Sequence, residues 1–209
     1  RSLTECLRPR VITKFTRGAL CLRAIANTFP IPIIHITRDP RAVIASIKKG
    51  RQTDWGEGAF HDFSLRAHLL EVDDGRRDYF QRWESDIEAI EKTDDYGRIA
   101  GYYCLTEHYL EDSFRGVSEG FTKLCYETLV TSGYQVIVES LIGLGLEPRF
   151  DCHERFALPS STDLNWPQSR KNFLMEERLL NWKSKLNERE RRIIEEVVAV
   201  FGMQKNLWR

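Results

Sequence analysis

The stretch Ile31-Pro32-Ile33-Ile34-His35-Ile36-Thr37-Arg38-Asp39-Pro40-Arg41 decides the fold class of this chain. Residues 31–37 are apolar at almost every position, which is typical of a strand covered on both faces. Pro32 fits only near the start of such a strand or on a sheet edge. Asp39 is a good helix N-cap and Pro40 suits the first helical position, so we expect a helix as far as Gly50. A strand followed at once by a helix indicates a parallel α/β sheet.

The sequence on both sides continues this alternation. Upstream, residues 11–13 form a short β-branched run that ends at Lys14, and a helical stretch follows with Leu20, Ala24 and Ile25 on one face. Downstream, we expect a helix over 99–114, a strand over 122–126, a turn at 127–129, a helix over 134–144 and a loop over 159–172. The last helix is expected to begin with a capping box of Asn187 and Glu190. Its apolar stripe consists of Ile193, Ile194, Val197, Val198 and Phe201. The fold class is therefore α/β, with a parallel sheet flanked by helices.

The segment 51–95 differs from the rest because it is polar and contains Gly56, Gly58 and Gly75. We interpret it as a polar insertion with one or two helices, of which 79–92 is the better candidate. The chain has 209 residues, a length that supports one substantial core. We therefore expect a single domain over 1–209 that carries this insertion.

Composition excludes several classes of protein. The 31 basic residues balance 31 acidic ones, so binding to nucleic acid through bulk charge is not expected. The longest stretch without a charged residue, 24–37, is too short to span a bilayer and contains two prolines, so we expect no membrane contact by this segment. The five cysteines show no CxxC or CxxH spacing, which argues against zinc, and we expect no metal.

The corner at residues 38–41 is the sharpest candidate for a binding site. Ligands of parallel sheets collect at the carboxyl ends of the strands, and a helix N-terminus there offers free N–H groups to a phosphate. Arg38 can bind phosphate oxygens with two nitrogens. Ser46 lies about two turns into the helix, so its hydroxyl contributes only if the anion lies along the helix flank. In the alternative interpretation, Arg38 pairs with Asp39 or another nearby acid and Ser46 is a small packing residue.

Several stretches resemble the sulfotransferases that use 3′-phosphoadenosine 5′-phosphosulfate. Residues 11–47, VITKFTRGALCLRAIANTFPIPIIHITRDPRAVIASI, include an Arg and a Ser eight positions apart, which in that family hold the 3′-phosphate. Residues 124–130, LCYETLV, resemble the YEDL-type segment, whose Tyr lies near the nucleotide. Trp182, Lys183 and Leu186, followed by the acidic start of the last helix, resemble the ending of the family. The resemblance covers most of the chain in the right order and implies a P-loop-like fold.

The resemblance also implies roles for single residues. Arg38, Ser46, Tyr126 and Ser169 would bind the nucleotide, and Lys14 would touch the sulfuryl group or the leaving oxygen. Taken alone, Lys14 is a solvated strand end, and Ser169 with its basic neighbours is a turn before the last helices. Other candidates also have a non-functional interpretation. The catalytic base could be His61, His68 or Glu57, although each could also be a surface residue. A sugar could stack on Trp55, Trp83 or Trp166, although these could also be packing residues, and His35 is expected to be a core histidine rather than a catalytic one.

One part of the family pattern is missing. The family opens with a strand and a Gly/Ser/Thr loop that holds the 5′-phosphosulfate through backbone N–H groups. Nothing before Lys14 matches it, so we expect this chain to lack the N-terminal strand and the phosphosulfate loop. No GxxxxGK[ST] motif occurs either, which argues against a nucleoside or nucleotide kinase.

The resemblance implies a sulfotransferase that moves a sulfo group from 3′-phosphoadenosine 5′-phosphosulfate to a hydroxyl. The segment after Ser46 resembles the carbohydrate and protein-tyrosine branches, so a glycan is the first expectation for the acceptor and protein tyrosine the second. In a eukaryote this branch works in the Golgi lumen; otherwise the cytoplasm is expected. The alternative is a non-catalytic relative that binds a nucleotide or a partner and lacks the donor loop.

Overall fold

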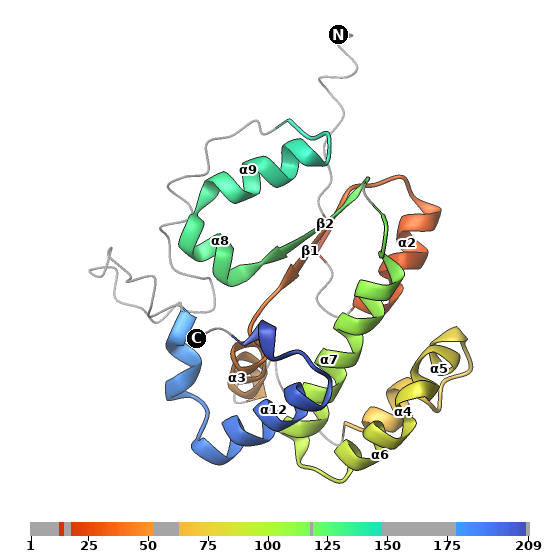
Figure 1. Ribbon diagram of the computed structural model, residues 1–209, viewed down its shortest axis with the longest axis vertical. Coiled ribbons are helices and arrows are strands. Elements are labelled where there is room, and N and C mark those ends of the chain that lie inside the picture. The colour runs from red at the N-terminus through yellow and green to blue at the C-terminus, as the bar shows by residue number, and fades with distance from the viewer. Residues whose placement is uncertain (1–12, 15–17, 52–62, 118, 148–178, 208–209) are drawn as a thin grey trace.

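The computed structural model describes residues 13–14, 18–51, 63–117, 119–147 and 179–207. This part of the chain is mixed α/β and mostly helical, with a small parallel sheet (Figure 1). Its elements are η1 (Ala19–Cys21), α2 (Leu22–Thr28), β1 (Ile33–Thr37), α3 (Pro40–Arg51), α4 (Leu65–Leu69), α5 (Gly75–Phe80), η2 (Gln81–Trp83), α6 (Glu84–Glu91), α7 (Asp95–Ser113), β2 (Phe121–Cys125), α8 (Tyr126–Ser132), α9 (Tyr134–Gly143), η4 (Asn181–Ser184), α12 (Glu188–Val200) and η5 (Gln204–Asn206).

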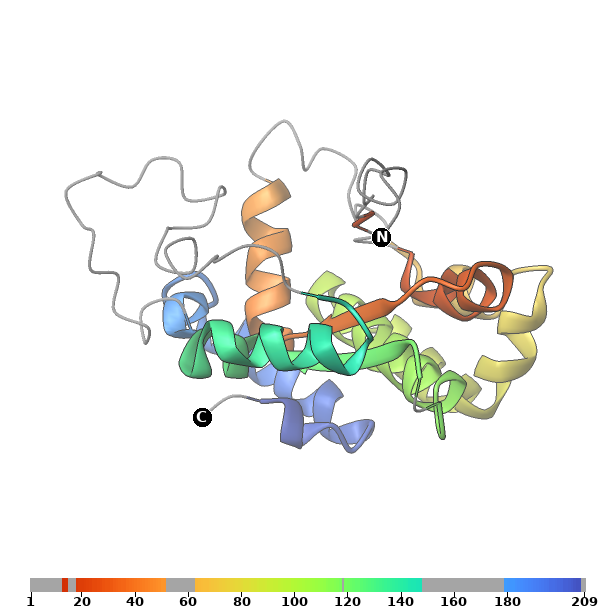
Figure 2. The same ribbon diagram turned by 90° about the horizontal axis from the view of Figure 1, so that it is seen from above.

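The sheet confirms a parallel α/β arrangement on a small scale. β1 and β2 pair in parallel, with Ile33 opposite Phe121 and Thr37 opposite Cys125. The connection between them contains α3 to α7, because parallel strands need a long crossover. In the view of Figure 1, α8 and α9 lie on one side of the strands and α2 and α7 on the other. Figure 2 shows α3 rising steeply from the end of β1.

The expectation that the first strand is covered on both faces is wrong. Ile33 is buried against Leu110 of α7 and Phe114 just after it, whereas Ile34 and Ile36 are 37% and 54% exposed. Side chains alternate between the two faces of a strand, so Ile34 and Ile36 share the face opposite Ile33. Continuous apolar sequence therefore does not correspond here to burial on both sides.

The strand expected over residues 11–13 is not seen where the structure describes it. Thr13 and Lys14 lie outside regular secondary structure and are exposed, and residues 11–12 lie outside the described residues. The following helical stretch is confirmed as η1 and α2, with Leu20 buried. The apolar face predicted for this helical stretch is wrong at Ala24, because that residue is exposed.

The polar segment, which we expected to be an insertion with one or two helices, contributes apolar side chains to the main core. Within residues 63–95, α4, α5, η2 and α6 follow one another, and the short 3₁₀ helix interrupts the single helix expected over 79–92. Apolar side chains of this segment belong to the same buried cluster as residues of α3, α7 and α12: Phe63, just before α4, and Leu65, Leu69, Phe80, Ile87 and Ile90 of the helices. A few well-spaced apolar residues are enough to bury one side of each short helix.

The turn expected at 127–129 is wrong, because α8 occupies Tyr126–Ser132. Its end is marked by Gly133, whose φ of 72° favours glycine. The neighbouring strand is confirmed one residue earlier than expected, and the helices expected over 99–114 and 134–144 are confirmed as α7 and α9. None of the helices in the described ranges is both long and apolar enough to cross a bilayer.

The last helix begins with the predicted capping box. The Asn187 side chain accepts the Glu190 N–H at 2.9 Å, and Glu190 accepts the Asn187 N–H at 2.8 Å. Glu190 is buried and also accepts hydrogen bonds from Lys48 Nζ of α3 at 2.7 and 2.8 Å. The same carboxylate thus caps α12 and ties it to α3.

We expect this cap to make stability depend on acid pH. Burial alone would raise the pKa of Glu190, but hydrogen bonds from Lys48 and the Asn187 backbone outweigh it and lower the pKa below its usual 4.5. The stabilisation is present above about pH 4.5 and is lost as pH falls through the lower pKa of the folded state. Glu190→Gln should cost about 1 kcal/mol at pH 7 and flatten the acid limb of a urea-unfolding series. Glu196→Gln, on an exposed side chain of the same helix, is the control; an unchanged acid limb in Glu190→Gln would contradict this account.

Candidate functional site

The register of the sheet brings Arg38 and Tyr126 together. Thr37 and Cys125 are paired at the carboxyl ends of β1 and β2, so the next residues of both strands lie at the same edge of the sheet. The Arg38 guanidinium carbon lies 4.4 Å from the centroid of the Tyr126 ring, within the range of a cation–π interaction. Two of the four residues that the family resemblance assigns to the nucleotide are therefore neighbours in space.

The start of α3 is not a free anion site, which corrects the expectation from the sequence. The Arg41 N–H donates to Asp39 Oδ1 at 2.8 Å, and the Ala42 and Val43 N–H groups donate to the Asp39 carbonyl oxygen at 3.0 and 3.1 Å. Asp39 donates its own N–H to Glu127 Oε1 at 2.9 Å. Pro40 has no N–H group to offer. With these donors satisfied and two buried carboxylates present, an anion at this corner has to bind along the helix flank.

Asp39 pairs with Arg41 rather than with Arg38. Arg41 Nη2 and Nε donate to the Asp39 carboxylate at 2.7 and 3.1 Å, and Arg41 Nη1 donates to Glu195 at 2.7 Å. Burial would lower the pKa of Arg41, but its bonds to Asp39 and Glu195 outweigh it and raise the pKa. The guanidinium therefore stays charged, and this corner is a structural ion-pair network.

Arg38 is left with an unneutralised charge in the part of the chain that the structure describes. No described carboxylate lies within ion-pair distance of its guanidinium, and its buried Nε has no hydrogen-bond acceptor there. The alternative interpretation, in which Arg38 pairs with Asp39, is thus not what the structure shows. A cation without a carboxylate at the carboxyl edge of a parallel sheet is suited to an anionic ligand.

The backbone at this corner is held by residues that the sequence did not single out. The Tyr103 hydroxyl of α7 donates to the Arg38 carbonyl oxygen at 2.6 Å. Burial raises the pKa of Tyr103, so its hydroxyl remains a donor at neutral pH. Glu127 is buried and links the start of α8 to the start of α3. A signal for Glu127 existed, an acid directly after the strand predicted over 122–126, whereas nothing local marks Tyr103.

Of the three other predicted site residues, the structure describes Ser46 and Lys14. Ser46 is exposed on α3, about 9 Å along the helix axis from Pro40 at 1.5 Å per residue. Lys14 is exposed and outside regular secondary structure. Ser169 lies outside the described residues. Their predicted roles stay predictions.

The remaining candidates have ordinary packing or surface environments where the structure describes them. His68 is exposed, and its Nδ1 lies 3.1 Å from the Ser64 carbonyl oxygen. Trp83 stacks on His108 at 5.4 Å and packs against the core. His35 Nε2 lies 2.9 Å from Glu107 Oε1, as fits a core histidine with a polar partner. Trp55, Glu57, His61 and Trp166 lie outside the described residues.

Two further observations complete the description of the site. Among the described residues, no cluster of His, Cys, Asp or Glu side chains could hold a metal ion. Comparison of the chain with protein-family models, with curated proteins and with solved structures finds no match in any of the three.

Proposed function

We propose that the chain is a sulfotransferase that transfers the sulfo group of 3′-phosphoadenosine 5′-phosphosulfate to a hydroxyl of a glycan. The observation that carries the proposal is the unneutralised Arg38 guanidinium, stacked on Tyr126 at the carboxyl edge of the sheet. Both residues are among the four that the sequence resemblance assigns to the nucleotide, and the charge and position of Arg38 suit a phosphate.

The residues at the corner fit the nucleotide in a specific way. Arg38 would hold the 3′-phosphate with its guanidinium, Tyr126 would keep that side chain in place, and Ser46 would add a hydroxyl from the flank of α3. The occupied N-terminus of α3 supports binding on the flank rather than at the helix end. The nucleotide, when bound, supplies the activated sulfo group, and Lys14 is the proposed contact to that group.

The first experiment is calorimetric titration of 3′,5′-adenosine bisphosphate and of 5′-AMP into the chain and into Arg38→Ala. A charge-assisted hydrogen bond contributes about 1.5–3 kcal/mol, so the variant should bind the bisphosphate about 10- to 150-fold more weakly. If Arg38 holds the 3′-phosphate, 5′-AMP should lose much less affinity, and the variant should barely distinguish the two nucleotides.

Two controls make the result specific. Arg77→Ala removes an exposed arginine of α5 and should leave both affinities unchanged. Thermal unfolding should show that Arg38→Ala is folded, because no described carboxylate forms an ion pair with Arg38 and would lose its partner. Equal affinity of the folded wild type for the two nucleotides, or no saturable binding at all, would refute the assignment. Transfer of label from the sulfo donor to a glycan then separates an enzyme from a protein that only binds.

A further inference from the structure

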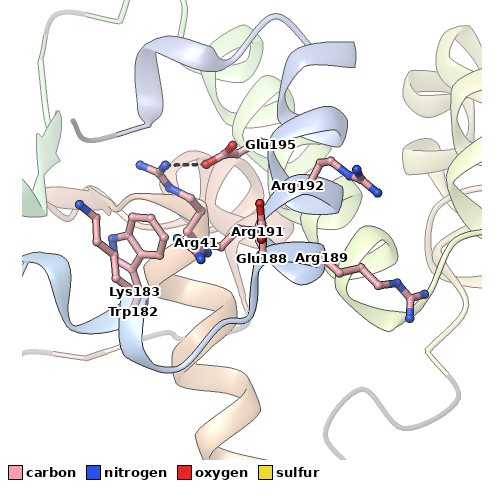
Figure 3. Close-up of a pocket in the computed structure, with 8 residues that line it drawn as sticks. All are labelled: Arg41, Trp182, Lys183, Glu188, Arg189, Arg191, Arg192 and Glu195. Atoms are coloured by element: carbon pink, nitrogen blue, oxygen red, sulfur yellow. Dashed lines mark hydrogen bonds and ion pairs between the residues drawn. The ribbon is translucent and has the colours of Figure 1, made fainter.

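A second basic site lies beside the start of α3, between η4 and α12. The cavity has a volume of about 780 Å³ and is lined by Arg41, Trp182, Lys183, Glu188, Arg189, Arg191, Arg192 and Glu195 (Figure 3). Arg38 and Tyr126 are not among these lining residues. We call it the α12 cavity.

The α12 cavity concentrates positive charge in a chain whose net charge is zero. Five of its lining residues are basic and two are acidic. Of the two acids, Glu195 is engaged by Arg41 at 2.7 Å, the contact drawn as a dashed line in Figure 3. Among the described residues, no carboxylate lies within ion-pair distance of Lys183 or Arg191. The cavity thus holds cations that the described structure does not neutralise.

The residues that line the cavity favour a charged ligand over one that binds by stacking on an aromatic ring. Trp182 is only 4% exposed, and its ring already has the Arg41 guanidinium at 4.1 Å and the Lys183 ammonium at 5.9 Å. A neutral sugar or a base therefore finds little free aromatic face here. Guanidinium and ammonium groups are donors without acceptors, so they match sulfate or phosphate oxygens.

The size of the cavity limits the ligand to a compact one. Its volume lies within the range of about 300–1,000 Å³ that is usual for small-molecule sites. Figure 3 shows Arg189 and Arg192 pointing away from the side where Arg41 and Trp182 lie. Since Arg41 is already paired with Asp39 and Glu195, Lys183 and Arg191 are the cations left for a ligand. We propose that the α12 cavity binds a compact polyanion carrying several sulfate or phosphate esters, at a site separate from the Arg38 corner.

The test uses two compact probes and their neutral parents on the full chain. Sucrose octasulfate and inositol hexakisphosphate are titrated by calorimetry at physiological salt, with sucrose and inositol beside them. At least one of the two polyanions should bind, and Lys183→Ala and Arg191→Ala should each weaken it by about three- to tenfold, as expected for removing one cation at a partly exposed site. Glu188→Gln should strengthen binding, because it removes the carboxylate of the lining that has no described ion-pair partner. Binding of one probe alone identifies the ester that the site prefers.

The control is Arg115→Ala, which removes an exposed arginine just after the end of α7, outside the cavity. It should leave probe binding unchanged. The proposal is overturned if neither polyanion binds saturably, or if Arg115→Ala weakens binding as much as Lys183→Ala does. It is also overturned if Arg38→Ala abolishes probe binding while Lys183→Ala and Arg191→Ala leave it unchanged, because the polyanion would then occupy the nucleotide corner.

Discussion

Replacing Asp39 with alanine is expected to lower the free energy of unfolding by about 3–5 kcal/mol, the usual cost of leaving one member of a buried ion pair without its partner. The Asp39 carboxylate is 1% exposed and accepts hydrogen bonds from three donors of Arg41, the backbone N–H, Nε and Nη2. Alanine leaves the buried Arg41 guanidinium with Glu195 and the Trp182 ring, and it removes the N-cap of α3. Urea unfolding monitored by circular dichroism measures the loss.

The chain contains a matched control for this prediction. Asp74 caps α5 with the same contacts, accepting the Arg76 backbone N–H at 2.9 Å and Arg76 Nε at 2.8 Å, but this pair lies at the surface. Asp74→Ala should therefore cost far less than Asp39→Ala, because water replaces the lost partner. Similar losses at the two sites would show that burial does not set the strength of the Asp39 pair.

Replacing Phe80 with alanine is expected to cost about 3–5 kcal/mol and to lower the stability of the whole described core. Phe80 is fully buried and belongs to the cluster that also contains Ile44 of α3, Leu105 of α7 and Ile194 of α12. Since the helices of residues 63–95 share one cluster with these elements, they should unfold together with them. Chemical unfolding should show one transition, shifted to lower denaturant with an unchanged slope.

Phe29→Ala is the control, because that side chain is 54% exposed and its removal leaves no cavity. Its midpoint should lie close to that of the wild type. A separate early transition in Phe80→Ala, with the rest of the unfolding curve unmoved, would mean that residues 63–95 form an independent appendage. In that case the sequence interpretation of this segment as an insertion would regain support.

Elements with strong local signals were predictable from the sequence. The N-cap and proline at residues 39–40 predicted the start of α3, and Asn187 with Glu190 predicted the capping box of α12. The turn expected at 127–129 is wrong, because these residues belong to α8. The buried Glu127 carboxylate of α8 accepts hydrogen bonds from the Asp39 N–H and the Cys125 thiol, and these contacts outweigh the local preference for a turn. The prediction that both faces of β1 are covered is wrong, because an apolar sequence does not show which face of a strand packs against another element.

For the candidate site, the strand–helix corner in the sequence predicted Arg38 and the family resemblance added Tyr126, but neither predicted their surroundings. A charged residue directly after a strand can be read from the pattern, and so can its distance from Ser46 along the chain. That the α3 N–H groups are already bonded, and that Arg41 rather than Arg38 takes Asp39, depends on side-chain directions at the corner. Tyr103 and Glu127 come from elements that local patterns cannot bring next to Arg38.

By itself, the sequence determined the starts of α3 and α12 and the β1–α3 corner, because caps, prolines and apolar runs act through neighbours along the chain. Tertiary structure alone decided which arginine is neutralised, that the polar segment joins the core, and that Lys183 and Arg191 line one cavity with Arg41. These outcomes depend on the packing of α3 against η4, α7 and α12, where desolvation and pairing between residues far apart in the chain set the energies.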